Sequence, residues 1–322
     1  MAPQPAAPGR GDRVFAGPDD RLQSVRQLNA PNRAACLYCG AGIEGAEIER
    51  LDVRELEGWE KGFNVIAGGF ADSNVRTAAD KLAAFMVADP EAINTILGAD
   101  ARVPVARVEF ADQAAAISKM LSEFGWDCIT IPDEDLLFSG TPVRLRAIDF
   151  DGDHLLLTPF GGGDPTLLPR EDLSLIVSST LFKERREAIE RKKRRSTTTV
   201  SETQLSTDER ILDLYTRKDP VGWRIPVSGF DFSSLGADKS LLALENMSKL
   251  LSRLCSFSPD ARMVDDYVSV RSLLEYCWPS EHRRDRSGPK SYGFPRKNSS
   301  SVFSSDNVLQ VTKYSRLQWH LL

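Results

Sequence analysis

Short apolar runs alternate with stretches of helical spacing between Phe63 and Pro132, and this stretch organises the rest of the chain. The runs are rich in β-branched residues and predict strands at 63–66, 103–110 and 128–131. Between them, apolar residues recur every three or four positions and predict helices at 75–88, 90–97 and 112–124. Gly98 and Gly125 follow two of these helices, where glycine commonly ends a helix. The stretch therefore predicts a small β-α-α-β-α-β module.

The later chain predicts a β-rich module with helices near its end. Alternating and apolar runs predict strands at 143–148, 155–157, 173–177, 210–215 and 223–227. The Asp151-Gly152 pair predicts the turn of the first hairpin. Apolar stripes predict helices at 241–255 and 267–276, and a last strand is expected at 307–322.

Two local sequences in the first module carry a resemblance to a known family. The helix start Glu109-Phe-Ala-Asp-Gln113 and the turn Phe124-Gly125-Trp126, within the element order of residues 63–132, resemble the C-terminal domain of the bacterial ribosomal stalk protein. The resemblance implies a bacterial-like, adaptor-like fold for this stretch. The stalk domain presents a Lys- and Gly-rich helical face to translation factors, whereas the corresponding helix here carries only Arg76 and Lys81 beside Asp80. The resemblance therefore implies the fold and no ribosomal activity.

Composition adds a division of charge between the two parts of the chain. The 322 residues are 41% hydrophobic and 27% charged, which is typical of a globular protein large enough for two domains. Residues 1–182 hold 16 Lys and Arg against 28 Asp and Glu, a net charge of −12. Residues 183–322 hold 25 against 18, a net charge of +7. Because the acidic and basic parts can attract each other, the basic part alone does not indicate nucleic acid.

These patterns predict an α+β protein in which a basic linker interrupts the second module. The expected parts are a disordered tail at 1–34, a C-x-x-C knuckle with an acidic segment at 35–60, the α/β module at 61–138, the β-rich module at 142–182 and 206–279, the basic linker at 183–205, and a basic loop with a terminal strand at 280–322.

Cys36 and Cys39, followed by Gly40, form the one sequence that resembles a metal site. A C-x-x-C knuckle can offer two thiolates to zinc, but a structural zinc site needs four ligands and no second pair has matching spacing. Two free thiols are the favoured interpretation. Zinc shared between chains or completed by a distant residue comes next, and a redox pair last. No cofactor other than this zinc is suggested.

The segment from Lys183 to Arg195 holds eight basic residues in thirteen, with Glu187 and Glu190 each four positions before an arginine. This spacing favours a solvated linker helix. The alternatives are docking on the acidic N-terminal half, or binding of nucleic acid or anionic lipid. The run has no aromatic residue beyond Phe182, which argues against single-stranded nucleic acid.

The sequence contains no spaced nucleophile–base pair, no complete metal-ligand set and no nucleotide-binding loop. We therefore expect a non-catalytic binding or adaptor protein with a protein partner. The alternative is a nucleic-acid-associated protein that uses the zinc knuckle and the basic residues Arg191, Lys192, Lys193, Arg194 and Arg195. The odd number of cysteines and the lack of a membrane-spanning apolar run or a signal peptide predict a cytoplasmic location. The oligomeric state is not predicted.

Overall fold

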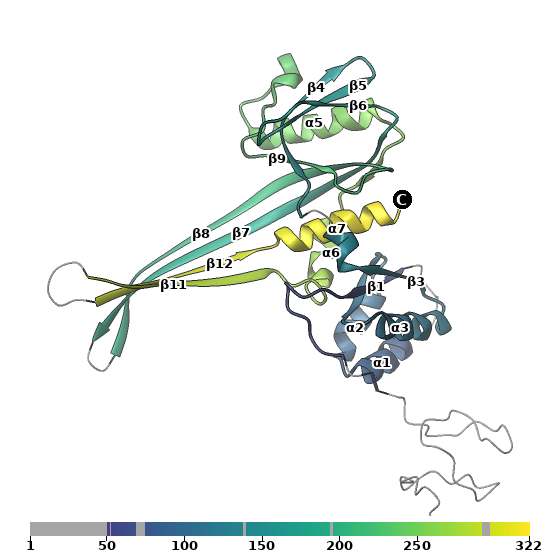
Figure 1. Ribbon diagram of the computed structural model, residues 1–322, viewed down its shortest axis with the longest axis vertical. Helices are drawn as coiled ribbons and strands as arrows, with labels where there is room; N and C mark the ends of the chain where they lie inside the picture. Colours follow the sequence, from purple (N-terminus) through teal and green to yellow (C-terminus); the bar gives the residue numbers. More distant parts are fainter. Residues whose placement is uncertain (1–49, 52, 69–74, 138–139, 194–195, 292–296) are drawn as a thin grey trace, which may run out of the picture.

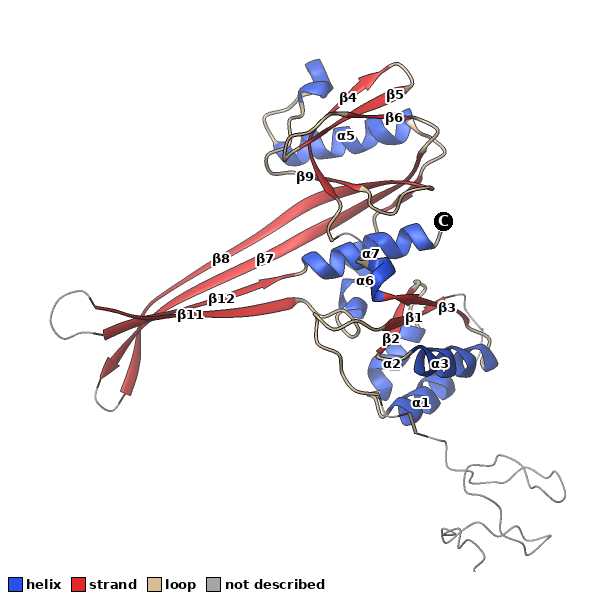
Figure 2. Cartoon of the chain, viewed as in Figure 1, coloured by secondary structure: helices blue, strands red, loops and turns tan. Residues whose placement is uncertain are grey.

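The computed structural model describes residues 50–51, 53–68, 75–137, 140–193, 196–291 and 297–322. The protein has the expected α+β class, with two sheets and their helices (Figure 2). An N-terminal lobe and a second lobe lie on either side of a central helix, and a long β arm projects from between them (Figure 1). The tail expected at 1–34 and the knuckle at Cys36 and Cys39 lie outside the described residues.

Three antiparallel strands form the sheet of the N-terminal lobe, in the order β2-β1-β3. The elements of this lobe are β1 (Phe63–Gly68), α1 (Val75–Met86), α2 (Pro90–Leu97), β2 (Val103–Val108), α3 (Ala111–Glu123), β3 (Asp127–Pro132) and α4 (Asp133–Leu136). The predicted order of elements is confirmed. Each helix carries its own apolar stripe, in which Leu82, Ile93 and Ile117 are fully buried.

The second lobe combines a hairpin sheet with one long helix. Its elements are β4 (Val143–Asp151), β5 (His154–Pro159), β6 (Thr166–Pro169), β9 (Trp223–Pro226), the 3₁₀ helix η1 (Ser233–Asp238) and α5 (Ala243–Phe257). Gly152 and Asp153 join β4 to β5, and Gly152 has a φ of 56°, the left-handed conformation that such short hairpin turns favour. Met247, Leu250 and Leu254 are buried on α5 and complete the core of this lobe, whereas Leu241 and Leu244, also expected in the apolar stripe, are exposed.

Two hairpins form the β arm. They consist of β7 (Leu173–Lys193) with β8 (Ser196–Thr216), and β11 (Glu281–Ser291) with β12 (Lys297–Asp306). β12 pairs with β7, so the strands of the arm have the order β11-β12-β7-β8. Nearer the lobes, the short strand β10 (Arg262–Val264) pairs in parallel with β7, and β9 continues the sheet from β8 into the second lobe.

The basic run is strand, so the solvated helix that we expected for it is wrong. Lys183–Lys193 belongs to β7 and pairs with β8 on one side and with β12 on the other. Charges four residues apart suit a helix, but they suit an exposed strand equally well. The described part of the segment at 183–205 is thus paired strand.

Two further expectations differ from the structure. The basic loop expected from residue 280 contains the strands β11 and β12. The strand expected at 307–322 is instead the helix α7 (Val308–His320), which packs beside α6 (Tyr267–Leu274). In both segments the partner that decides the structure is far away in the sequence.

Helix α7 lies between the two lobes and is buried on every side (Figure 1). Every residue from Gln310 to Gln318 is buried, including Lys313 and Arg316. Its apolar residues Val311 and Leu317 belong to the same core cluster as the N-terminal lobe. Because buried polar groups need hydrogen-bond partners, the contacts of α7 determine how the lobes and the arm are joined.

Candidate functional site

Asn307, directly before α7, joins the root of the arm to the central helix. Along one edge of β7, β10 pairs with residues 175–177 and β12 pairs from Lys183 onward. Between these two pairings, Asn307 forms hydrogen bonds with β7 like those of a neighbouring strand. The backbone N–H of Phe182 donates to Asn307 Oδ1 at 2.7 Å, and Asn307 Nδ2 donates to the carbonyl oxygen of Thr180 at 3.0 Å. Its amide therefore continues the hydrogen-bond ladder of β7 where no strand does so.

Replacing Asn307 with alanine is expected to lower the free energy of unfolding by about 1–3 kcal/mol, because it removes the partner of a largely buried backbone N–H. Urea denaturation would measure this loss. Hydrogen exchange at the amide of Phe182 should also become faster, since that amide would lose its acceptor. Wild-type stability together with wild-type exchange at Phe182 would contradict the assignment.

A chain of buried side chains continues from Asn307 to the N-terminal lobe, and we call it the buried polar chain. Asn307 Nδ2 also donates to the hydroxyl of Tyr267, which donates to Gln310 Oε1 at 2.6 Å. Gln310 Nε2 donates to the carbonyl oxygen of Trp278 at 2.7 Å, and the indole of Trp278 donates to Asn64 Oδ1 at 2.7 Å. Hydrogen bonds therefore connect the root of the arm to β1 without interruption.

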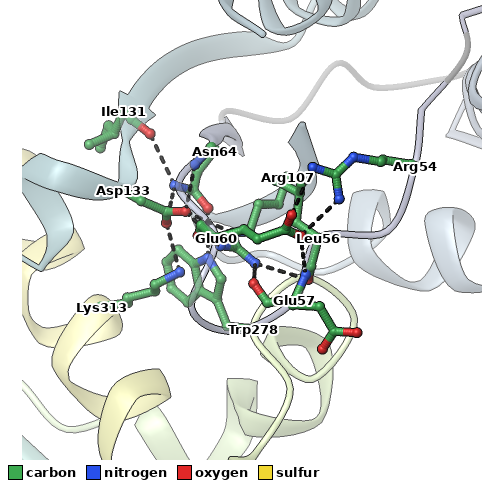
Figure 3. A network of polar contacts seen from close by, with 11 residues as sticks. Arg54, Leu56, Glu57, Glu60, Asn64, Arg107, Ile131, Asp133, Trp278 and Lys313 are labelled. Carbon is green, nitrogen blue, oxygen red and sulfur yellow. Dashed lines mark hydrogen bonds and ion pairs between the residues drawn. The ribbon is translucent and has the colours of Figure 1, made fainter. Parts of the chain in front are cut away.

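The buried polar chain ends at Asp133, the first residue of α4 (Figure 3). Asn64 Nδ2 and Lys313 Nζ donate to Asp133 Oδ1 at 3.0 and 2.7 Å, and Arg107 Nε donates to Oδ2 at 2.8 Å. The side chains of Asp133, Lys313 and Arg107 are each at most 5% exposed. Arg107 also donates to three carbonyl oxygens of the segment preceding β1, at Leu56, Glu57 and Glu60.

One carboxylate facing two cations explains the electrostatics of this cluster. Burial alone would raise the pKa of Asp133, but Lys313, Asn64 and Arg107 outweigh it and hold the pKa below its usual range. Burial lowers the pKa of Lys313, Asp133 offsets this only in part, and the nearby positive charge of Arg107 lowers the pKa further. Asp133 is therefore the charge on which the cluster depends.

The side chains near this cluster are poorly suited to nucleophilic chemistry. Burial raises the pKa of the Cys277 thiol to about 12 and that of the Cys128 thiol to about 11. Burial also raises the pKa of Tyr267 to about 12. A cavity of about 450 Å³ reaches Cys277 and Arg107, yet a reactive thiol needs a lowered pKa. The arrangement favours holding segments together over transferring protons at neutral pH.

A second cavity, of about 570 Å³, lies on the β arm near its root, and we call it the arm cavity. Its lining comes from three strands: Glu184, Arg186 and Ala188 of β7, His282, Arg283 and Arg284 of β11, and Phe303, Ser304 and Ser305 of β12. The guanidinium carbon of Arg284 lies 4.5 Å from the ring centre of Phe303, in cation–π geometry. The arm cavity therefore combines an aromatic ring with three arginines and one glutamate.

The single carboxylate of the arm cavity already has partners. Glu184 Oε1 accepts hydrogen bonds from Arg186 Nε at 2.5 Å and from Gln204 Nε2 at 2.8 Å. Arg283 pairs with Glu281 at 2.8 Å. Among the described side chains, Arg284 has no carboxylate within ion-pair distance, so its charge is available to a ligand.

The residues singled out from the sequence are only partly brought together. Arg191, Lys192 and Lys193 lie on β7 beyond the arm cavity, whereas Arg194 and Arg195 lie outside the described residues, as do Cys36 and Cys39. Sequence reasoning missed Phe303 and placed Arg284 only in an expected basic loop. Only the pairing of β11 and β12 with β7 places these two residues beside the basic run.

Two kinds of feature are absent from the described part of the chain: a membrane-spanning helix and a cluster of metal ligands. No helix there is both long and apolar enough to cross a membrane. Across the same residues, three or more His, Cys, Asp or Glu side chains nowhere gather closely enough to hold a metal ion. Zinc at Cys36 and Cys39 stays a prediction, because neither cysteine is among the described residues.

The resemblance of residues 63–132 to the ribosomal stalk domain also stays a prediction, since it depends on element order and two short sequences. No protein-family model matches the chain, and neither a curated protein nor a solved structure is significantly similar to it.

Proposed function

We propose that this chain is a non-catalytic, cytoplasmic binding protein whose β arm is the surface that contacts a macromolecular partner. One observation carries the proposal: the arm extends away from both lobes as a four-stranded sheet (Figure 1). A sheet that projects from both lobes is accessible to a partner in a way that the packed cores are not (Figure 1). The reducing environment of the cytoplasm suits the odd number of cysteines in the sequence.

The way the arm is attached to the lobes supports the same proposal. A contact surface recognises its partner best when it is held in one position before binding. Asn307 anchors β7, and the buried polar chain connects that anchor to the N-terminal lobe. The arm would therefore act as a rigid projection of the body rather than as a flexible tether.

Photo-cross-linking tests this proposal, because a reactive residue reports only what touches its own position. Gln204 on β8 and Leu244 on α5 are both exposed, so they form a pair on and off the arm. A benzophenone amino acid at Gln204, in cells that naturally make the protein, is expected to cross-link a partner. The same residue at Leu244 is expected to cross-link none. Cross-links from Leu244 alone, or from neither position, would overturn the proposal.

A shortened arm provides a second measurement. The pairs Arg185–Leu205 and Arg283–Ser304 lie opposite each other in their hairpins. Joining each pair through Asn-Gly would remove the outer arm while keeping the register. This variant is expected to retain the thermal midpoint of the lobes and to lose the partner identified from Gln204.

A further inference from the structure

The arm cavity belongs to one continuous face of the four-stranded sheet. Directly opposite residues in adjacent antiparallel strands lie on the same face. Phe303 is opposite Arg284 on β11 and opposite Arg186 on β7, which in turn is opposite Gln204 on β8. One row of side chains thus crosses the whole arm, with an aromatic ring between two arginines.

The ring of Phe303 is accessible in this row. Phe303 is 39% exposed although Arg284 lies against it. An exposed aromatic ring on a strand otherwise rich in serine is not needed for the core, since Phe303 belongs to neither hydrophobic cluster. Arginine beside a phenyl ring offers both a stacking surface and a positive charge.

Positive charge increases outward along the same strands. Beyond the arm cavity, the strand segments at 189–193, 196–202, 286–291 and 297–300 carry six basic residues in the sequence against Glu190 and Glu202. The six are Arg191, Lys192, Lys193, Arg286, Lys290 and Lys297. Since Arg191 pairs in register with Asn298, two basic segments that are far apart in the sequence converge on one part of the arm.

Resting on the proposed function, we propose that the partner is single-stranded nucleic acid, bound across this face of the arm. A base stacks in the arm cavity against Phe303 and Arg284, and the phosphates run outward along the basic strands. Single strands are favoured over a duplex because the ring of Phe303 can reach only an unpaired base. The structure also removes the objection that the basic run lacks an aromatic residue, because β12 supplies one.

The test uses the full chain and a fluorescein-labelled oligonucleotide of about 16 nucleotides, as RNA and as DNA, with a duplex of equal length. Fluorescence anisotropy over a series of salt concentrations is expected to show binding to the single strands and weaker binding to the duplex. Phe303→Leu should weaken single-strand binding about 5- to 150-fold, because the stacking partner is lost. It should leave the salt dependence unchanged.

Arg284→Gln separates charge from stacking. Each phosphate contact on a single strand contributes about −0.7 to the slope of log K against log salt, so this variant should make the slope about 0.7 less steep. The matched control is Phe160→Leu: Phe160 is 48% exposed and lies under Arg144 at 4.1 Å, but in the second lobe. This control is expected to bind as the wild type does.

Several results would overturn the inference. They are no single-strand binding by the wild type at low salt, equal affinities of Phe303→Leu and Phe160→Leu, or duplex binding that is indifferent to Phe303. Binding instead to vesicles of phosphatidylserine and phosphatidylcholine would assign the charge to a membrane surface and overturn it too. A protein cross-linked from Gln204 without oligonucleotide binding would overturn only this inference, whereas the absence of any cross-link from the arm would overturn the proposed function.

Discussion

Asp133→Asn is expected to lower the free energy of unfolding by about 3–5 kcal/mol, the cost of leaving buried charges without their partner. The substitution keeps the shape of the side chain, so it creates no cavity. Lys313 and Arg107 would remain buried with no carboxylate between them. Urea denaturation at neutral pH would measure the loss. Asp135→Asn is the matched control, because Asp135 lies on the same short helix and is exposed.

The pH dependence of this effect follows from the lowered pKa of Asp133. A carboxyl group whose pKa is lower in the folded protein than in the unfolded chain stabilises the fold above its unfolded pKa, about 4. That stabilisation is lost as the pH falls through the lower, folded pKa. The difference between wild type and Asp133→Asn should therefore be constant from pH 7 to about 5 and should shrink below about 4. A difference independent of pH down to the acid unfolding of the wild type would contradict the assignment.

Arg224→Met is expected to destabilise the protein by a similar amount, about 3–5 kcal/mol. Arg224 on β9 lies opposite Asp213 on β8, and its Nε and Nη2 donate to the two carboxylate oxygens at 2.8 and 2.7 Å. Both side chains are almost completely buried. Burial alone would lower the pKa of Arg224, but Asp213 outweighs it and raises the pKa. The single substitution would therefore leave the charge of Asp213 buried and unpaired.

The double variant Asp213→Leu with Arg224→Met distinguishes the cost of an unpaired charge from a need for the pair itself. Replacing a whole buried ion pair with apolar residues of similar size is often neutral or stabilising. The double variant is therefore expected to regain most of the stability that Arg224→Met loses, as measured by urea denaturation of both. A double variant as unstable as the single one would show that the pair orders β8 against β9 in a way that packing cannot replace.

The sequence predicted the elements of the N-terminal lobe because each element there is encoded locally. Ile93, Ile96 and Leu97 mark α2 by their own spacing, and Asp89 with Pro90 marks its start. The strands around them are rich in apolar and β-branched residues. For such segments a single stretch of sequence contains the information that decides its structure.

The arm and helix α7 could not be predicted in this way, because distant partners decide them. The charges of Lys183–Lys193 suit a helix or a strand, and pairing with β8 and β12 makes the choice. The sequence of α7 suggests that Lys313 is a surface residue, but the side chain is buried because Asp133 supplies a buried carboxylate. The arm cavity was hidden for the same reason, since Phe303 and Arg186 meet only across two strands.

The pairing of β12 with β7 also constrains the order in which the chain can fold. Strand β8 follows β7 closely in the sequence, so their hairpin can form early, whereas β12 joins β7 from more distant sequence and must form later. Until β12 joins, one edge of β7 has unpaired backbone groups, and such an edge is a usual starting point for aggregation. Charged residues on such an edge discourage pairing with other chains. The dense charge of Lys183–Lys193 would therefore protect the folding intermediate as well as serve the finished arm.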